Sequence, residues 1–347
     1  MTQQTIVDRN TNLDFLRFIA ISCIILAHMG IPTIIFQARN FDVPLMVLLS
    51  GISFSLYSSK SYSSYPSYLY SRFIRLIIPT WIFLVFYNSM IWAGNNDIPS
   101  TYNLCLQFSL IGGSDIGIWI IRIFFSMAII APFLLKINNQ LISNKAFFIT
   151  LFVTYIIYEI FLYNSRLILP EELFKITKLI ILFTVSYGVI FLFGIRIPSL
   201  KSKEIKLSIL VFGIVFFTSL SILYAQNNKI IPTQQFKYPP QIYYFSYALF
   251  ASLVLFYLTK FHESKLYQLR LFQFIGRSTL WIYLWHWFFI KVYNYINIDL
   301  HYFSKYMVIY SSTIVLVYVQ TSLVSLVTDR KILNTNKNRL LIKLFTG

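Results

Sequence analysis

Apolar residues along the chain gather into ten runs, each long enough for a helix, with polar or turn-forming residues between them. Runs of about twenty apolar residues are typical of transmembrane helices. Gly, Pro, Asn and Ser mark the gaps, as at 61–66 and 238–240. The predicted helices cover residues 13–29, 43–57, 76–93, 118–135, 146–163, 178–195, 207–224, 243–260, 272–293 and 305–327.

Composition supports this reading of the pattern. Hydrophobic residues make up 57% of the 347 residues and charged residues 12%, about half the charged share of a soluble domain. This excludes an ordinary soluble enzyme, and also a disordered chain, which needs low hydrophobicity. We predict an all-α, polytopic integral membrane protein with about ten transmembrane helices. Residues 1–347 form one membrane-embedded domain, with tails at 1–12 and 328–347.

The charge distribution predicts an orientation. The formal net charge is +17. With the N-terminus in the cytoplasm, nineteen of the 29 Lys and Arg residues fall on the cytoplasmic side, seven fall on the other side and three lie within spans. Because cytoplasmic loops carry an excess of Lys and Arg, both termini and both tails are predicted to be cytoplasmic. No basic stripe lies outside the apolar runs, so nucleic acid is not an expected partner.

Cysteine and histidine usage argues against a metal site. Cys23 and Cys105 cannot form a disulfide framework or a metal cage by themselves. The four histidines are scattered, without an HxxxH or CxxC pair. We therefore expect no metal cofactor.

The first predicted helix carries three ionisable residues, Asp14, Arg17 and His28. Such groups at membrane depth are costly and mark a functional site or a pair by default. Arg17 and His28 are eleven residues apart, so a helix places both on one face about 16 Å apart along its axis. The alternatives are snorkelling of Arg17 to headgroups and a hydrogen bond from His28 to a neighbouring helix.

The third predicted helix follows two arginines. Arg72 and Arg75 lie on one face of the helix near its start, and their guanidinium groups could bind phosphates through bidentate hydrogen bonds. Their alternative role is to anchor the helix on the cytoplasmic side.

Further polar or ionisable groups lie in later helices. The fourth helix begins with Trp119 and Arg122 on the outer side, and the fifth ends near Glu159, which could pair with an arginine. His286 lies among aromatic residues in the ninth helix, where packing in an interfacial belt is the simpler interpretation.

Five short motifs follow one another in a fixed order over residues 12–290. They are Leu13-Asp14-Phe15-Leu16-Arg17 followed by His28, Val43 to Ser50-Gly51, Arg72-x-x-Arg75-Leu76, Ile118-Trp119-Ile120-Ile121-Arg122, and Gly276-Arg277-Ser278 leading to His286. In this order they resemble the membrane acyltransferase-3 family in a stand-alone form, of the type that acetylates O-antigen or capsule.

The resemblance implies transfer of an acyl group, commonly acetyl from acetyl-CoA, to a hydroxyl of an extracytoplasmic glycan. It also implies a multi-pass protein of the inner, or plasma, membrane. The acceptor would be a polysaccharide such as O-antigen, capsule or exopolysaccharide, free or lipid-linked. The family's catalytic histidine and arginine correspond to His28 and Arg17, and its basic pair to Arg72 and Arg75.

We expect coenzyme A phosphates at the cytoplasmic mouth and the thioester near His28. His28 would act as general base or carry the acyl group transiently. Asp42, Asp115 and Glu159 are the candidates to orient its imidazole. The acceptor-side or supporting residues are predicted to be Trp119, Arg122, Asp14, Ser50, Glu159 and His286.

Two other functions fit a basic protein with ten helices. One is a transporter or flippase of a lipid-linked sugar, although transporters often show internal repeats and the sequence has no convincing repeat. The other is a membrane-assembly subunit without catalysis.

Overall fold

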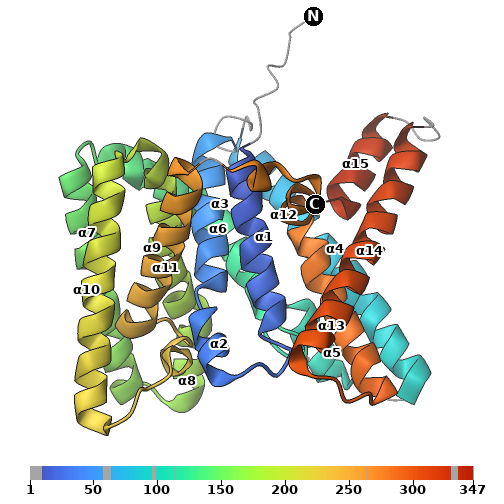
Figure 1. Cartoon of the computed structure of the whole chain (residues 1–347), viewed down its shortest axis with the longest axis horizontal. Coiled ribbons are helices and arrows are strands. Elements are labelled where there is room, and N and C mark those ends of the chain that lie inside the picture. Colours follow the sequence, from blue (N-terminus) through green and yellow to red (C-terminus); the bar gives the residue numbers. More distant parts are fainter. Residues whose placement is uncertain are drawn as a thin grey trace, which may run out of the picture.

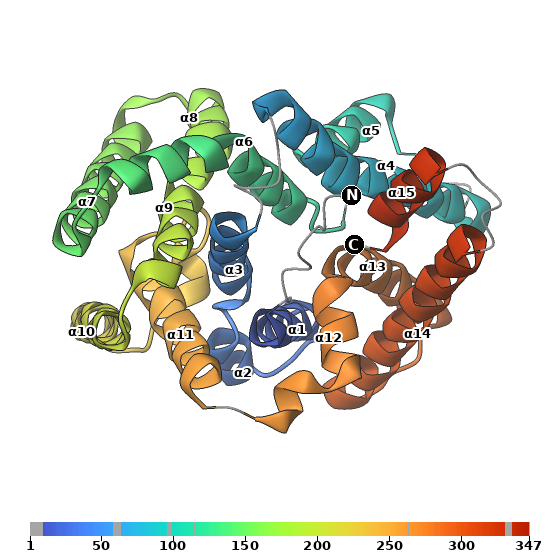
Figure 2. The same cartoon turned by 90° about the horizontal axis from the view of Figure 1, so that it is seen from above.

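Two short helices at the centre of the molecule are surrounded by longer ones (Figures 1 and 2). The computed structural model describes residues 10–57, 64–95, 99–113, 115–262, 264–329 and 335–346. The central pair is α1 (Thr11–Leu26) and α3 (Asp42–Leu56), joined by α2 (Thr33–Ala38). The other helices are α4 (Tyr65–Asn95), α5 (Thr101–Phe108), α6 (Trp119–Gln140), α7 (Asn144–Ile168), α8 (Glu171–Thr177), α9 (Phe183–Arg196), α10 (Ser202–Asn227), α11 (Ile242–Phe261), α12 (Arg270–Arg277), α13 (Thr279–Ile296), α14 (Tyr302–Asp329) and α15 (Thr335–Phe345).

Among the described residues every regular element is helical, which confirms the predicted all-α class. In the part of the chain that the structure describes, seven helical segments are long and apolar enough to cross a membrane, which supports a multi-pass membrane protein. These segments are Tyr65–Gly94, Trp119–Gln140, Asn144–Ile168, Glu171–Ser199, Ser202–Asn227, Ile242–Phe261 and Tyr302–Thr328.

Among the described residues, three of the ten predicted helices do not have the length and composition of a membrane span. Helices α1 and α3 have 16 and 15 residues, whereas about twenty residues are needed to span the hydrocarbon core. The predicted helix 272–293 is divided at Ser278 into α12 and α13. Central helices can be short because neighbouring protein, rather than lipid, surrounds their ends.

Helix α1 ends earlier than the sequence pattern predicted, at Leu26 rather than at residue 29. Gly30 adopts a positive φ of 74°, a conformation that favours glycine, and Pro32 follows it. The residue before a proline is also disfavoured in the helical conformation. His28 therefore lies in a turn beyond the helix, where its backbone N–H donates to the carbonyl of Ile25 at 3.0 Å.

Helices α3 and α9 pack with their backbones in close contact. A Cβ on Gly51 would collide with the backbone carbonyl oxygen of Phe191, and a Cβ on Gly194 with that of Leu48. Small residues of this kind let helices approach closely inside membranes. The contact keeps α3 at the centre, where most of its residues are buried.

The outer helices expose apolar side chains. Helices α7, α10 and α14 leave large hydrophobic residues uncovered along their length, among them Phe152, Leu210 and Val315. A continuous apolar exterior of this kind fits contact with lipid.

The predicted C-terminal tail contains a packed helix. The Trp281 indole donates to the backbone carbonyl of Leu344 at 2.8 Å, and the Gln320 amide donates to that of Phe345 at 2.8 Å. Helix α15 lies at the end of the molecule where α1 begins (Figure 1).

We predict that Gly51→Ala destabilises the protein. The added methyl must push α3 away from α9, and overpacking of this kind costs about 1–3 kcal/mol. The thermal unfolding midpoint of the purified variant should fall. The control is Gly94→Ala in α4, where a Cβ meets nothing within 4 Å. Equal midpoints for the two variants would contradict the prediction.

Candidate active site

A cavity of about 660 Å³ extends into the protein from the end of the molecule where α1 begins. Its mouth includes Asn10 and Tyr57, and its apolar walls include Ile21, Ile24 and Phe124. Helix α1 runs inward along it, so Ile24 lies about two turns deeper than Arg17. The cavity therefore extends from a polar mouth to Tyr283, whose ring lies 5.2 Å from that of His286.

Four arginines line the cavity, and the lining that the structure describes contains no carboxylate. Three of them, Arg17, Arg72 and Arg75, were predicted as site residues, and the structure brings them together. The fourth, Arg277, was not predicted as a site residue. Its signal was its place in the Gly276-Arg277-Ser278 motif, but it was counted there only as a charge that sets orientation.

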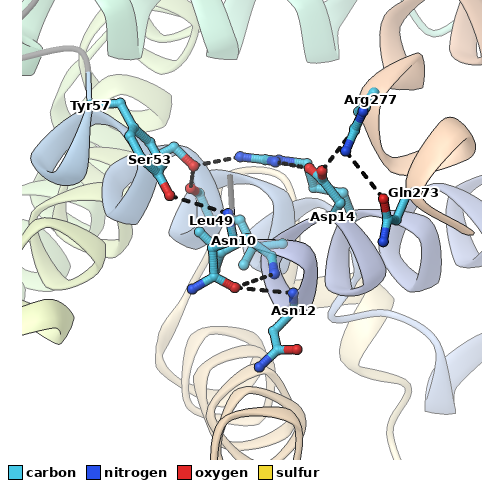
Figure 3. Close-up of polar contacts among 10 residues, drawn as sticks. Asn10, Asn12, Asp14, Leu49, Ser53, Tyr57, Gln273 and Arg277 are labelled. Carbon is cyan, nitrogen blue, oxygen red and sulfur yellow. Dashed lines mark hydrogen bonds and ion pairs between the residues drawn. The ribbon is translucent and has the colours of Figure 1, made fainter. Parts of the chain in front are cut away.

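Asp14 connects two of these arginines (Figure 3). Its carboxylate is fully buried, and it accepts from Arg17 Nη1 at 2.6 Å and from Arg277 Nε at 3.3 Å. Arg17 also donates to the hydroxyl of Ser53, which in turn donates to the carbonyl of Leu49 at 2.7 Å. Arg17 is thus held in the cavity wall rather than extended to lipid headgroups.

The approach of α12 to α1 depends on a glycine. A Cβ on Gly276 would collide with the backbone of Asp14. Without that Cβ, the end of α12 lies against α1, and Arg277 reaches the carboxylate. Arg277 also donates to the Gln273 side chain at 3.2 Å.

His28 lies within a cluster of rings beyond the end of α1. Its ring centroid is 4.4 Å from that of Trp287 and 5.6 Å from that of His286. Among the described residues nothing forms a hydrogen bond with the His28 imidazole. Within the described residues its nitrogens therefore keep their hydrogen-bonding capacity.

His286 is fully buried beside His28. Its Nδ1 contacts the carbonyl of Tyr283, so this nitrogen carries the hydrogen. Its Nε2 is buried and has no hydrogen-bond partner among the described residues. Tyr283 also lines the cavity and donates through its hydroxyl to the carbonyl of Gly117. Tyr283 thus links the cavity wall to the two histidines.

A buried ionic cluster belongs to the surroundings of His28. We call Arg39, Asp42 and Lys237 the outer ionic cluster. These three residues are the charged groups that act electrostatically on His28. Of the three carboxylates predicted to orient the imidazole, only Asp42 belongs to this set. No motif pointed to Lys237, which comes from a loop 197 residues after Asn40 in the chain.

Trp119 lies next to this cluster. Its ring is 5.3 Å from Tyr238, the neighbour of Lys237. Arg122 lies one turn further along α6, where it donates to the carbonyl of Leu110 at 3.3 Å and lies 5.8 Å from the Phe183 ring.

The remaining predicted residues have different positions. Ser50 lines the cavity and donates to the carbonyl of Met46 at 2.9 Å. Glu159 lies on α7, and α9 and α11 separate that helix from α1 (Figure 2). The structure therefore does not bring Glu159 to His28.

Within the described residues, no three His, Cys, Asp or Glu side chains form a group that could hold a metal ion.

A protein-family model matches most of the chain. The model of the acyltransferase-3 family, described as an acyltransferase domain, matches residues 10–327. The chain therefore belongs to this family, and acyl transfer is its general activity. Searches of curated proteins and of solved structures gave no match.

We predict that Asp14→Asn destabilises the mouth of the cavity. The change keeps the side-chain size but leaves Arg17 and Arg277 without their shared counter-charge. Loss of a buried partner costs about 1–3 kcal/mol, so the thermal unfolding midpoint should fall. Asp299→Asn, at an exposed position, is the matched control. The prediction is wrong if the two variants unfold at the same temperature.

Proposed function

We propose that this protein transfers an acetyl group from cytoplasmic acetyl-CoA to a sugar hydroxyl of a cell-surface polysaccharide. It would work in the inner, or plasma, membrane, with both termini in the cytoplasm. The observation that carries the proposal is the cavity that extends from four arginines to Tyr283, whose ring lies 5.2 Å from that of His286, the neighbour of His28. Such a cavity offers a path for a donor that arrives on one side and an acceptor on the other.

The arginines favour a donor with several phosphates. Guanidinium groups bind phosphate bidentately, and coenzyme A presents phosphates at one end of a long arm. Asp14 neutralises part of the charge of Arg17 and Arg277. Arg72 packs over the ring of Tyr68 at 5.2 Å and so presents its guanidinium with a fixed face. The apolar walls beyond the arginines suit the pantetheine arm and its thioester.

His28 would act as the general base. The acceptor hydroxyl oxygen forms a bond to the thioester carbonyl carbon while His28 takes the hydroxyl proton. The carbonyl oxygen carries the negative charge until the carbon–sulfur bond breaks. The leaving thiolate then receives the proton from His28, which returns to its neutral form. In the second possible route, the acyl group stays on the imidazole before transfer.

The acceptor would bind beyond His28, next to Trp119 and Tyr238. Aromatic faces next to polar groups suit a sugar ring, which has apolar and hydroxyl-bearing surfaces. The acceptor class itself, an O-antigen, capsule or exopolysaccharide unit, rests on the family resemblance.

We predict that His28→Ala removes acetyl transfer. General-base catalysis contributes about 10²–10⁴-fold, so the rate of acetyl transfer by the purified variant should fall at least about 10²-fold. The rate is measured with radiolabelled acetyl-CoA and an isolated surface glycan. The control is His301→Ala, at an exposed histidine near the start of α14.

Two outcomes would contradict the proposal. One is a normal transfer rate in the His28 variant. The other is a parent protein that consumes no acetyl-CoA in vesicles, as a transporter or an assembly subunit would behave.

We predict that neutral variants at the mouth weaken donor binding. A hydrogen bond to a charged group contributes about 1.5 kcal/mol or more, which is about tenfold in affinity. We therefore expect the KM for acetyl-CoA to rise about tenfold in each of three variants, Arg72→Gln, Arg75→Gln and Arg277→Gln. Lys136→Gln is the control, because Lys136 is exposed and does not line the cavity. Equal KM values for Arg277→Gln and Lys136→Gln would exclude Arg277 from the donor site.

A further inference from the structure

The outer ionic cluster is almost completely buried. Arg39, Asp42 and Lys237 are 6%, 1% and 2% exposed. Arg39 Nη1 lies 2.5 Å from one oxygen of Asp42, and Lys237 Nζ lies 3.6 Å from the other. The cluster thus joins the start of α3 to the loop between α10 and α11.

Neutral polar groups hold the cluster in place. Lys237 Nζ donates to Asn40 at 3.0 Å, and Asn40 donates to Thr233 at 3.0 Å. Thr233 donates to Gln37 at 2.9 Å. A connected network of this kind fixes the position of the charges before any substrate arrives.

The outer ionic cluster contains more hydrogen-bond donors than acceptors that they contact. The Nε of Arg39 is buried and has no hydrogen-bond partner among the described residues. Buried polar atoms without a partner are rare in proteins and call for an explanation. Arg39 therefore retains hydrogen-bonding capacity at a position that water does not reach.

The cluster contains two cations and one carboxylate. Burial lowers the pKa of Lys237 below its ordinary value, and Asp42 opposes this effect. The desolvation that lowers this pKa also makes the ammonium costly for the fold. The Arg39–Asp42 pair is already neutral, and Thr233 already joins the two segments through its hydrogen bonds with Asn40 and Gln37. Neither charge balance nor the joining of the segments therefore requires Lys237.

The position of the cluster points to another role. Arg39, Asp42 and Lys237 act electrostatically on His28. Lys237 also lies 5.6 Å from the ring of Tyr238, which contacts Trp119. Trp119 in turn meets Trp287 at Gly117, and the Trp287 ring contacts His28, so the excess positive charge lies among the aromatic groups that lead to His28.

We propose that the outer ionic cluster stabilises the negative charge that forms on the thioester carbonyl oxygen during acyl transfer. This inference rests on the proposed acyl transfer at His28. Attack of the acceptor oxygen moves the carbonyl π electrons onto that oxygen, and breakage of the carbon–sulfur bond returns them. Fixed charges in a site of low dielectric stabilise such a charge strongly, because they need no reorganisation when it forms.

Substitution of Lys237 separates this role from a structural one. Lys237→Met keeps the length of the side chain and leaves Arg39 paired with Asp42. We expect kcat to fall at least about tenfold, less than the loss of a donor in direct contact, with the KM values of both substrates within about twofold. The thermal unfolding midpoint should stay equal or rise, because a costly buried charge is gone.

Three further variants complete the experiment. Lys237→Arg keeps the charge and should retain most of the kcat. Arg39→Gln removes the other cation and leaves Asp42 paired with Lys237. Like Lys237→Met, it should lower kcat. Lys175→Met is the matched control, because Lys175 is also an ion-paired lysine but lies exposed on α8.

An unchanged kcat in Lys237→Met would overturn the proposal. So would a parallel loss of kcat and unfolding midpoint that Lys237→Arg does not restore, which indicates a structural clamp. An increase confined to the KM of the glycan would overturn it too, because the cluster would then bind an anionic acceptor. His28→Ala reports on acyl transfer independently, so this inference can fail while the proposed function stands.

Discussion

The carboxylate of Asp14 is fully buried, and two arginines from opposite halves of the chain supply its counter-charges. An isolated carboxylate at this depth would be very costly. Its ion pairs hold Arg17 in the cavity wall and draw the end of α12 onto α1, where Gly276 gives the backbone room. Helix α13 starts directly after this contact, so the same pairs set the position of Tyr283 and His286 relative to His28.

The arrangement of long and short helices makes this polar interior possible. Long apolar helices such as α7, α10 and α14 expose large hydrophobic side chains to their surroundings. Helices α1 and α3 lie inside this shell (Figure 2), so they can carry charged side chains without contact with lipid. The two ends of the cavity region then differ in electrostatic character. The arginines at the mouth are partly exposed and can receive a mobile anion, whereas the outer ionic cluster is enclosed and acts as a fixed charge.

Much of the fold could be predicted from the sequence, because the length and apolarity of a segment decide whether it forms a helix in a membrane. Each of the ten predicted helices overlaps a helix in the structure. The exact ends were less predictable. Local backbone chemistry at Gly30 and Pro32 ends α1 before His28, and Ser278 divides the ninth predicted helix. Short central helices could not be distinguished from spanning ones, because the sequence does not reveal which segments other helices surround.

The sequence by itself determined the membrane class, the family motifs and the grouping of Asp14, Arg17 and His28, because these residues lie within about four helical turns of one segment. Only the tertiary structure decided which distant residues join them. Arg277 and Lys237 reach the site from more than 200 residues along the chain from Asp14 and His28 respectively, whereas Glu159 lies on a helix that packs elsewhere. The physical reason is that charge pairing in a protein interior depends on distance in space and on burial, and neither follows from separation along the chain.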